Sequence, residues 1–349
     1  MSLGSTFKNP IKQPTTELSR TDTAIESFAF DLQSIPTVCV VCCSTSDMPH
    51  DTIITVARAM QSLAMVRMIL LSETGEEKSE DMEVITVPLG TKLSKLRRIA
   101  DLVETNLFCI CDPDFTVDEK ACLLVLRQAI ADMRAGKEVV AFGVVEGKID
   151  RTLLSQVIAV DKWLSHRILR RFLWTFGIGL TLPGQFLIVS SSLLHNLPPR
   201  IDSYLDDLYL GWVARQRGAI IRRMSVVTGC EEPRINWSSL LTQRCRWMRG
   251  LMHLFQHLLQ HPLAIVLLGI HFVAYHGLPI VAMIAILSLA ASNPLCGLGV
   301  FFSSAAILSI ASRQSLLTSC TFLGIFPFVH LLAMIFWCVP LKRSILIRR

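Results

Sequence analysis

The chain has 349 residues, of which 51% are hydrophobic and 18% charged, and its formal net charge is +6. A mean hydropathy of +0.48 is too apolar for an ordinary soluble protein, so the chain is not simply two soluble domains. The basic residues cluster beside apolar segments, which suits contact with anionic lipid headgroups and gives no support for a nucleic-acid partner.

Residues 1–33 are polar and predict a disordered N-terminal tail, without the apolar core of a signal peptide. Strands and helices then alternate, which predicts a cytosolic α/β domain over residues 34–250 with a mostly parallel sheet. The strands are expected at residues 37–43, 66–71, 83–87, 107–111, 139–145, 185–190 and 220–227. The helices are expected at residues 51–63, 92–104, 116–135, 161–174, 203–217 and 236–260. The segment 161–174 mixes aromatic and basic residues, so it is either an interfacial membrane helix or an ordinary surface helix.

The C-terminal part contains two long uncharged runs, residues 263–312 and 314–341. A lipid-spanning helix needs roughly 20 apolar residues, so these runs predict about three spans, near residues 263–290, 295–312 and 318–340. Residues 251–262 would form an interfacial helix, residues 263–341 the transmembrane region and residues 342–349 a basic tail.

The basic residues after the apolar runs do not fit three membrane crossings. Three crossings from the cytosol would place the basic tail outside, against the positive-inside tendency. A break at Pro279 or a re-entrant segment would restore a cytosolic C-terminus, which we favour. A channel or transporter would carry ionisable residues within its spans, and only His271, His276 and His330 occur there.

Two aspartates, Asp112 and Asp114, follow the predicted strand 107–111 and flank Pro113. Ligands of such sheets bind beyond the carboxyl ends of the strands. Two carboxylates at that position suit Mg²⁺ or Mn²⁺ shared with substrate phosphates. An ordinary polar loop would also give this pattern, because a bare Asp-x-Asp is common.

A second acidic pair, Asp206 and Asp207, lies near the start of the predicted helix 203–217. The helix dipole favours carboxylates there, so capping alone would explain the pair. In the functional interpretation, one of the two takes a proton from an attacking hydroxyl.

A third motif, Gln243-Arg244-Cys245-Arg246-Trp247, lies on the helix before the apolar runs. The spacing places Gln243, Arg246, Trp247 and Gly250 on one helix face. An arginine there can bind a diphosphate, and a tryptophan can stack on a sugar or base. Alternatively, the arginines of a juxtamembrane helix meet lipid headgroups.

In their order and spacing, these three motifs resemble the processive-type branch of the inverting family-2 glycosyltransferases. That group includes cellulose, chitin and hyaluronan synthases and ceramide glucosyltransferase. The resemblance extends from about residue 37 through the spans. Lys92, with Leu96, matches the lysine-containing helix before the Asp-x-Asp, and Gly184-Gln185-Phe186 matches the glycine segment before the acceptor site.

The resemblance implies a GT-A-like, Rossmann-like fold and a membrane-bound hexosyltransferase. It would transfer a sugar from a nucleotide-sugar, by family habit a UDP-sugar, to a polysaccharide or lipid acceptor, with Mg²⁺ or Mn²⁺ as cofactor. The implied roles are nucleotide binding for Asp112 and Lys92, metal binding for Asp114, the catalytic base for Asp207, and acceptor or diphosphate binding for Gly184, Gln185, Gln243, Arg246 and Trp247.

Two segments depart from the family pattern. Residues 70–74 read Leu-Leu-Ser-Glu-Thr, with Glu73 where the family has aspartates that grip the nucleotide base. Residues 44–47 read Ser-Thr-Ser-Asp in place of the usual Pro-x-x-Asn-Glu. The alternative interpretation is therefore a weak or inactive membrane subunit that regulates a partner enzyme. A homo-oligomer remains equally open.

Overall fold

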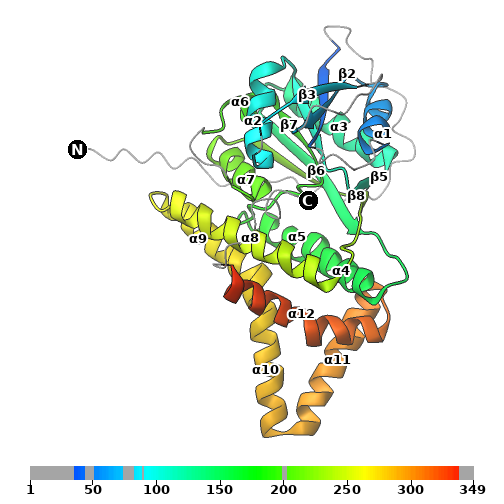
Figure 1. Cartoon of the computed structure of the whole chain (residues 1–349), viewed down its shortest axis with the longest axis vertical. Coiled ribbons are helices and arrows are strands. Elements are labelled where there is room, and N and C mark those ends of the chain that lie inside the picture. Colours follow the sequence, from blue (N-terminus) through cyan, green and yellow to red (C-terminus); the bar gives the residue numbers. More distant parts are fainter. Residues whose placement is uncertain (1–34, 44–50, 74–81, 89, 199–202, 338–349) are drawn as a thin grey trace, which may run out of the picture.

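The computed structural model describes residues 35–43, 51–73, 82–88, 90–198 and 203–337. The predicted tails at 1–33 and 342–349 and the segment 44–47 lie outside these residues. The described chain forms one mixed, mostly parallel α/β sheet with flanking helices, followed by long apolar helices (Figure 1). The predicted fold class is confirmed.

The sheet of the described residues contains eight strands in the order β3-β2-β1-β4-β7-β6-β8-β5. Their bounds are β1 Thr37–Cys43, β2 Met65–Ser72, β3 Glu83–Thr86, β4 Leu107–Cys111, β5 Phe115–Val117, β6 Val139–Gly147, β7 Phe186–Ser190 and β8 Ile220–Glu231. β7 runs antiparallel to both of its neighbours, β4 and β6, so the start of β7 lies beside the end of β4. This antiparallel strand brings the residues before β7 to the edge where ligands are expected.

Each strand alternates its side chains between two apolar cores, because successive residues point to opposite faces of a sheet. Val40 and Cys109 face α1 (Asp51–Met60) and α3 (Glu119–Arg134). Val41 and Phe108 face the opposite core, which α2 (Lys92–Leu102), α6 (Ser191–His195) and α7 (Asp206–Gln216) cover. Both faces are therefore buried, which explains the continuous apolar runs of the strands.

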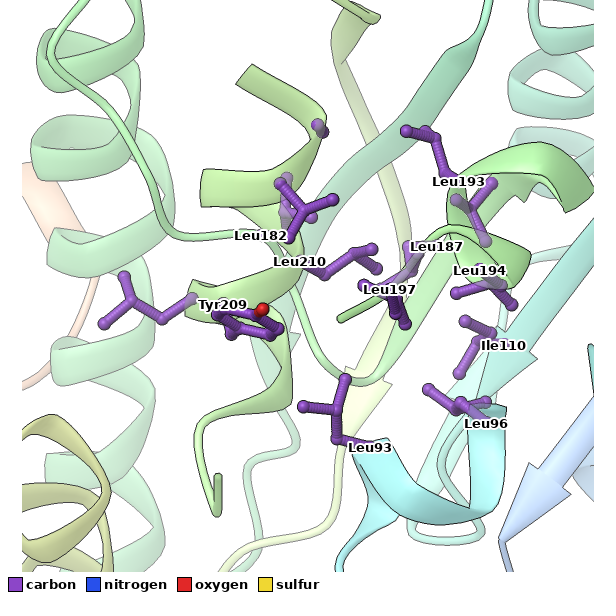
Figure 2. Close-up of a cluster of buried hydrophobic side chains, with 14 of the residues drawn as sticks. Leu93, Leu96, Ile110, Leu182, Leu187, Leu193, Leu194, Leu197, Tyr209 and Leu210 are labelled. Carbon is purple, nitrogen blue, oxygen red and sulfur yellow. The ribbon is translucent and has the colours of Figure 1, made fainter. Parts of the chain in front are cut away.

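Figure 2 shows the second core, where α2, β4, β7 and α7 converge. Leu96, Ile110 and Leu187 are each at most 1% exposed. Fully burying such a side chain stabilises the fold by about 1.5–3 kcal/mol. This core holds α2 and α7, the two helices that begin at candidate site residues.

Three predicted helix starts were wrong, and one of them, predicted at residue 203, lies at Asp206. The helix predicted to begin at residue 116 begins at Glu119, because residues 115–117 form β5 and pair with β8. Asp118 caps it by accepting a hydrogen bond from the Ala121 amide (2.9 Å). The helix predicted at 161–174 begins eight residues earlier, as α4 (Leu153–Trp163), and continues through the π-helical segment η1 (Leu164–Leu169) into α5 (Arg170–Thr175).

The C-terminal part contains α8 (Trp237–His257), α9 (Pro262–Phe272), η2 (Val273–Gly277), α10 (Leu278–Ser292), α11 (Pro294–Ser312) and α12 (Leu316–Phe336). Within the described chain, three helical stretches are long and apolar enough to cross a membrane: Pro262–Ser292, Pro294–Ser312 and Leu316–Phe336. The π-helical turn η2 precedes Pro279, which lacks an amide hydrogen and crowds the preceding turn. The helix therefore continues through Pro279 instead of breaking there.

Figure 1 shows α10 and α11 as an antiparallel hairpin that projects away from the sheet. α12 instead lies across the underside of the α/β part, against α4 and α8. No residue of α10 is buried, whereas α12 buries Phe322 and Phe326 against α4.

Candidate active site

The carboxyl ends of β4 and β8 and the start of β7 meet at one edge of the sheet. The Asp112 amide donates to the Gln185 carbonyl (2.9 Å), which joins the Asp-x-Asp turn to the glycine segment. The Glu232 amide donates to the Asp114 carbonyl (2.9 Å), which joins the same turn to the end of β8. Asp112 and Asp114 are therefore held by backbone contacts on both sides, and both are buried.

Lys92, the first residue of α2, lies between two carboxylates. Its Nζ is 2.7 Å from Asp112 Oδ1 and 3.5 Å from Asp206 Oδ2, and it donates to the Gly184 carbonyl at 2.6 Å. The three charged side chains are at most 7% exposed. Lys92 thus connects the Asp-x-Asp turn, the glycine segment and the acidic pair, three motifs that are distant in the sequence.

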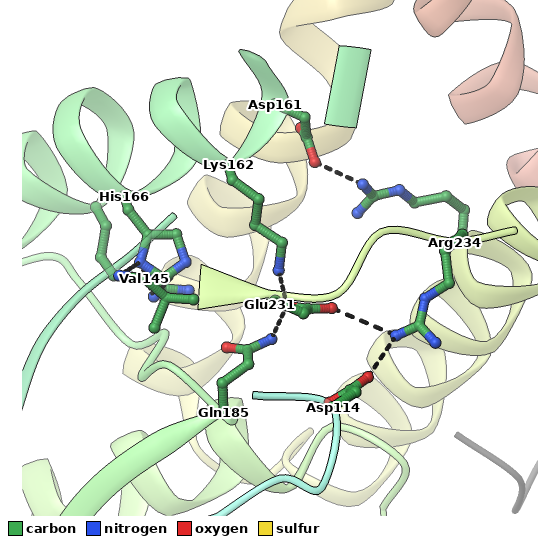
Figure 3. Close-up of polar contacts among 10 residues, drawn as sticks. Asp114, Val145, Asp161, Lys162, His166, Gln185, Glu231 and Arg234 are labelled. Atoms are coloured by element: carbon green, nitrogen blue, oxygen red, sulfur yellow. Dashed lines mark hydrogen bonds and ion pairs between the residues drawn. The ribbon is translucent and has the colours of Figure 1, made fainter. Parts of the chain in front are cut away.

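A second charged cluster is centred on Glu231, at the end of β8 (Figure 3). Its carboxylate accepts hydrogen bonds from Lys162 and from Gln185. Arg234 donates to Glu231 at 3.3 Å and to Asp114 at 3.4 Å. Burial alone would raise the pKa of Glu231, but Lys162 and Arg234 bring the pKa below its ordinary value. Glu231 is therefore a buried, ionised carboxylate.

Gln243 joins this cluster from α8. With its amide oriented so that the oxygen faces a donor, Gln243 accepts a hydrogen bond from Arg234 at 2.9 Å. Arg234 thus connects Asp114 of the Asp-x-Asp turn with Gln243 of the Gln-x-x-Arg-Trp motif. Arg234 and Lys162 were not among the site residues predicted from the sequence. The charged run Glu-Glu-Pro-Arg at residues 231–234, shortly after the predicted strand 220–227, was the available signal for Arg234.

Asp207 lines a cavity between α7, α8 and the apolar helical segments α9, η2 and α12. Gln185, Arg244 and Trp247 line the same cavity. The Arg244 guanidinium lies 4.1 Å from the centre of the Trp247 ring and pairs with Asp161 at 2.6 Å. The motif contains two buried arginines, Arg244 and Arg246. Arg244 lines the cavity, and Arg246 is not among the described residues that line it.

Gly250 allows α8 to approach the segment that leads into α7. A Cβ at this position would lie 2.9 Å from Leu205 Cγ and 3.2 Å from the Leu205 backbone nitrogen. The Gly250 carbonyl also accepts a hydrogen bond from Ser203 (3.5 Å). Gly250 is therefore a packing position, which sets the distance between α8 and the segment that precedes Asp207.

The residues at this edge suit a divalent cation that is shared with a substrate. Among the described residues, no group of three or more His, Cys, Asp or Glu side chains could hold a metal ion alone. Mg²⁺ in nucleotide enzymes takes only one or two carboxylates, with phosphates and water as the other ligands. Asp112 and Asp114, two buried carboxylates past one strand end, fit this arrangement.

Glu73 directly follows β2 and is the last described residue before the segment 74–81. Its carboxylate lies 2.6 Å from Nζ of Lys95, whose side chain is 5% exposed. The carboxylate at the expected nucleotide-base position is therefore held by a buried lysine of α2.

Comparison with known proteins supports the fold. No protein-family profile and no curated protein matches the sequence. Among solved structures, the chain is similar to the mannosyltransferase PcManGT from Pyrobaculum calidifontis, solved with GDP-Man and Mn²⁺. The identity is 12% and the TM-score 0.50, over 85% of this chain and 88% of that one. Glucosyl-3-phosphoglycerate synthase from Mycobacterium tuberculosis is also similar, at 17% identity and a TM-score of 0.43, over 63% and 79% of the two chains. The likeness to PcManGT shows that the chain has a GT-A-like glycosyltransferase fold.

Proposed function

We propose that this chain is a membrane-bound inverting glycosyltransferase that transfers a sugar from a nucleotide-sugar to a lipid or polysaccharide acceptor. One observation carries the proposal: Asp112 and Asp114 lie at one sheet edge, and Gln185 connects that edge to the cavity lined by Asp207 and Trp247. The GT-A-like fold, and a neighbour that binds GDP-Man and Mn²⁺, support a nucleotide-sugar donor. The resemblance to family 2 favours a UDP-sugar.

The donor would bind at the edge of the sheet. Asp112 would contact the nucleotide, and Asp114 would hold Mg²⁺ or Mn²⁺, which supplies positive charge to neutralise the diphosphate when bound. Arg234, 3.4 Å from Asp114, is placed to contact the leaving diphosphate, in addition to Arg246. Lys92 supports the donor site indirectly, by holding Asp112.

The transfer is a single displacement. The acceptor oxygen forms a bond to the anomeric carbon while the bond from that carbon to the diphosphate breaks. Asp207 takes the proton of the acceptor hydroxyl, and the nucleoside diphosphate leaves with the bonding electron pair. Gln185, Gln243 and Trp247 would shape the acceptor side of this reaction. One displacement inverts the anomeric centre and needs no carboxylate nucleophile.

The three apolar helical stretches support an integral membrane protein, and we place its catalytic domain in the cytosol.

One observation favours the second candidate function, an inactive subunit that regulates a partner enzyme. Glu73 is paired with Lys95 at the position where the family pattern has an aspartate. A carboxylate held in this way is a weaker acceptor for a nucleotide base.

The test uses the full chain in nanodiscs made with native membrane lipids. Nucleotide release is measured with Mg²⁺ or Mn²⁺ for a panel of UDP- and GDP-sugars. We expect release with one donor, its loss with a chelator, and a decrease of at least about 100-fold in Asp207→Asn, because the general base is removed. Asp101→Asn, the same change on the exposed side of α2, should leave release unchanged.

The opposite result identifies the second candidate. If no donor is turned over and calorimetry detects no nucleotide binding in the presence of metal, the transferase proposal is wrong. The chain would then be a regulatory subunit, and its partner enzyme would be sought by co-purification.

A further inference from the structure

Apolar helices form the wall of the Asp207 cavity that lies opposite the sheet. His271 of α9, Tyr275 and His276 of η2 and His330 of α12 line this wall. α9, η2 and α12 all belong to stretches apolar enough to cross a membrane. The side of the cavity opposite the sheet therefore borders the region expected to lie in lipid.

This wall is polar although the helices that form it are apolar. His276 and His330 share a hydrogen bond (2.9 Å), and His271 contacts the Thr181 hydroxyl (2.8 Å). The Tyr275 hydroxyl and the second ring nitrogen of His330 are buried and have no hydrogen-bond partner among the described residues. A buried polar group without a partner destabilises the fold, so these two atoms indicate a polar ligand in the cavity.

Among the described residues that line this cavity, Arg170 is the cation without an anionic partner. Its side chain lines the cavity and is only 6% exposed. Lys162 pairs with Glu231 and Arg244 with Asp161, but no carboxylate of the described chain forms an ion pair with Arg170. A buried charge without a counter-ion is strongly destabilising.

His166, the neighbour of Arg170, cannot supply the missing charge. Arg170 lies 3.1 Å from His166, whose Nδ1 accepts a hydrogen bond from the Val145 amide (3.2 Å). Burial, and then the charges of Arg170 and Lys162, keep the pKa of His166 well below its ordinary value, so the ring is neutral. Arg170 therefore presents an uncompensated positive charge to the cavity.

We propose that the acceptor is a membrane lipid whose head group carries both a hydroxyl and a negatively charged group, such as a phosphate diester. The hydroxyl would lie at Asp207 and the anion at Arg170, with Tyr275 and His330 hydrogen-bonding the head group. This inference rests on the proposed function and names its acceptor class. A neutral polysaccharide would leave Arg170 without a counter-ion.

The size and position of the cavity agree with this acceptor. It encloses about 70 Å³, and on this scale one water molecule needs roughly 10–15 Å³. It therefore holds a polar group of several atoms, while the lipid chains remain in the bilayer beside α9 and α12. In the reaction, the head-group oxygen bonds to the anomeric carbon, the bond to the nucleoside diphosphate breaks, and Asp207 receives the hydroxyl proton.

The test reconstitutes the full chain into vesicles of phosphatidylcholine mixed with phosphatidylglycerol or with diacylglycerol, and adds a radiolabelled nucleotide-sugar and Mn²⁺. Sugar transferred to lipid is measured in the organic phase, and nucleotide release is measured in parallel. We expect labelled lipid only with phosphatidylglycerol, at least about tenfold less in Arg170→Met, and partial recovery in Arg170→Lys. Arg171→Met is the matched control, because Arg171 is the next residue on the same helix and is exposed.

A binding measurement separates this inference from the proposed function. Short-chain phosphatidylglycerol should raise the unfolding temperature of the wild-type chain and of Arg171→Met, and have little effect on Arg170→Met. Glycerol 3-phosphate, added as a free phosphate, should not reproduce this shift, because the lipid chains add to binding. Lipid binding without nucleotide release would overturn the transferase proposal but support the lipid site.

Three results would overturn the inference. The first is equal labelling of diacylglycerol, which has a hydroxyl but no phosphate; this would show that no anionic head group is needed. The second is an equal loss of transfer in Arg170→Met and Arg171→Met, which would indicate general attraction to an anionic surface. The third is an equal shift with glycerol 3-phosphate, which would identify a soluble phosphate as the ligand.

Discussion

At the scale of single residues, the candidate site depends on buried charges that neutralise one another. Lys92 lies between Asp112 and Asp206, and Arg234 lies between Asp114 and Glu231. Such charges are costly to bury singly, so removing one partner is expected to destabilise the fold more than removing an exposed pair. The same pairs fix the positions of the carboxylates from which binding and catalysis are proposed.

Lys92→Met should lower the free energy of unfolding by about 3–5 kcal/mol, because two buried carboxylates lose the cation between them. Thermal unfolding in detergent, followed by intrinsic fluorescence, measures the change. Lys137→Met is the control, since Lys137 is exposed. Equal stability of the two variants would show that Lys92 does not compensate the two carboxylates.

Glu231→Gln should destabilise the chain in a pH-dependent manner. The folded pKa of Glu231 lies below the unfolded value of roughly 4.3, so ionised Glu231 stabilises the fold above that pH. This contribution is lost as the pH falls through the folded pKa.

The stability difference between wild type and Glu231→Gln should therefore be about 3 kcal/mol and constant from pH 7 to 5. It should shrink below about pH 4.3. Unfolding midpoints measured between pH 7 and 3 test this. A difference that stays constant to pH 3 would contradict an ionised, paired Glu231.

At the scale of elements, close packing of α8 against the start of α7 sets the geometry around Asp207. Gly250 leaves no room for a Cβ beside Leu205, and Leu205 directly precedes the acidic pair. Small displacements of a catalytic group are costly: a misplacement of about 1 Å can reduce a rate 100-fold.

Gly250→Ala should therefore reduce sugar transfer by about tenfold or more. Donor binding should be unchanged, because Asp112 and Asp114 lie on another element. Initial rates over a range of donor concentrations separate the two effects. Gly299→Ala is the control, because a Cβ there would meet nothing within 4 Å. A raised KM for the donor at unchanged kcat would argue against displacement of Asp207.

At the scale of the whole molecule, α12 differs from the other two apolar stretches. Near its start, Thr318 donates to Gln156 of α4 (2.6 Å), and at its end the Trp337 carbonyl accepts from Arg249 of α8 (2.8 Å). Both ends of α12 thus contact helices within residues 34–250, the range predicted for the catalytic domain. A helix that crossed the bilayer would move one end away from it, so we expect α12 to lie along the membrane surface.

The hairpin of α10 and α11 would then provide two crossings in place of three. α11 has 19 residues, or about 28 Å, close to the hydrocarbon thickness of about 30 Å. Two crossings return the chain to its starting side. This arrangement agrees with the cytosolic C-terminus that the basic tail favours.

Cys296, exposed beside the hairpin turn, tests this arrangement. In sealed vesicles with the α/β part outside, a membrane-impermeant maleimide should not label Cys296 until the membrane is permeabilised. Mass spectrometry identifies the labelled peptide, and Cys296→Ser confirms the assignment. Labelling before permeabilisation would show that the hairpin is re-entrant.

The sequence by itself determined the α/β class, most of the strands and helices, and the apolar helices. These follow from the spacing of hydrophobic residues and from composition, which are local properties of the chain. It also placed Asp112 correctly at a strand end and Asp206 at a helix start. For Lys92, the sequence led us to expect a contact with the nucleotide. It did not predict the ion pairs of Lys92 with Asp112 and Asp206.

Only the tertiary structure decided which side chains meet. Arg234 and Asp114 are 120 residues apart, and Thr318 and Gln156 are 162 apart. The short strand β5, the antiparallel position of β7 and the unmatched charge of Arg170 also depend on partners far along the chain. Local propensity carries no information about such contacts, because burial and pairing are set by the packing of the whole molecule.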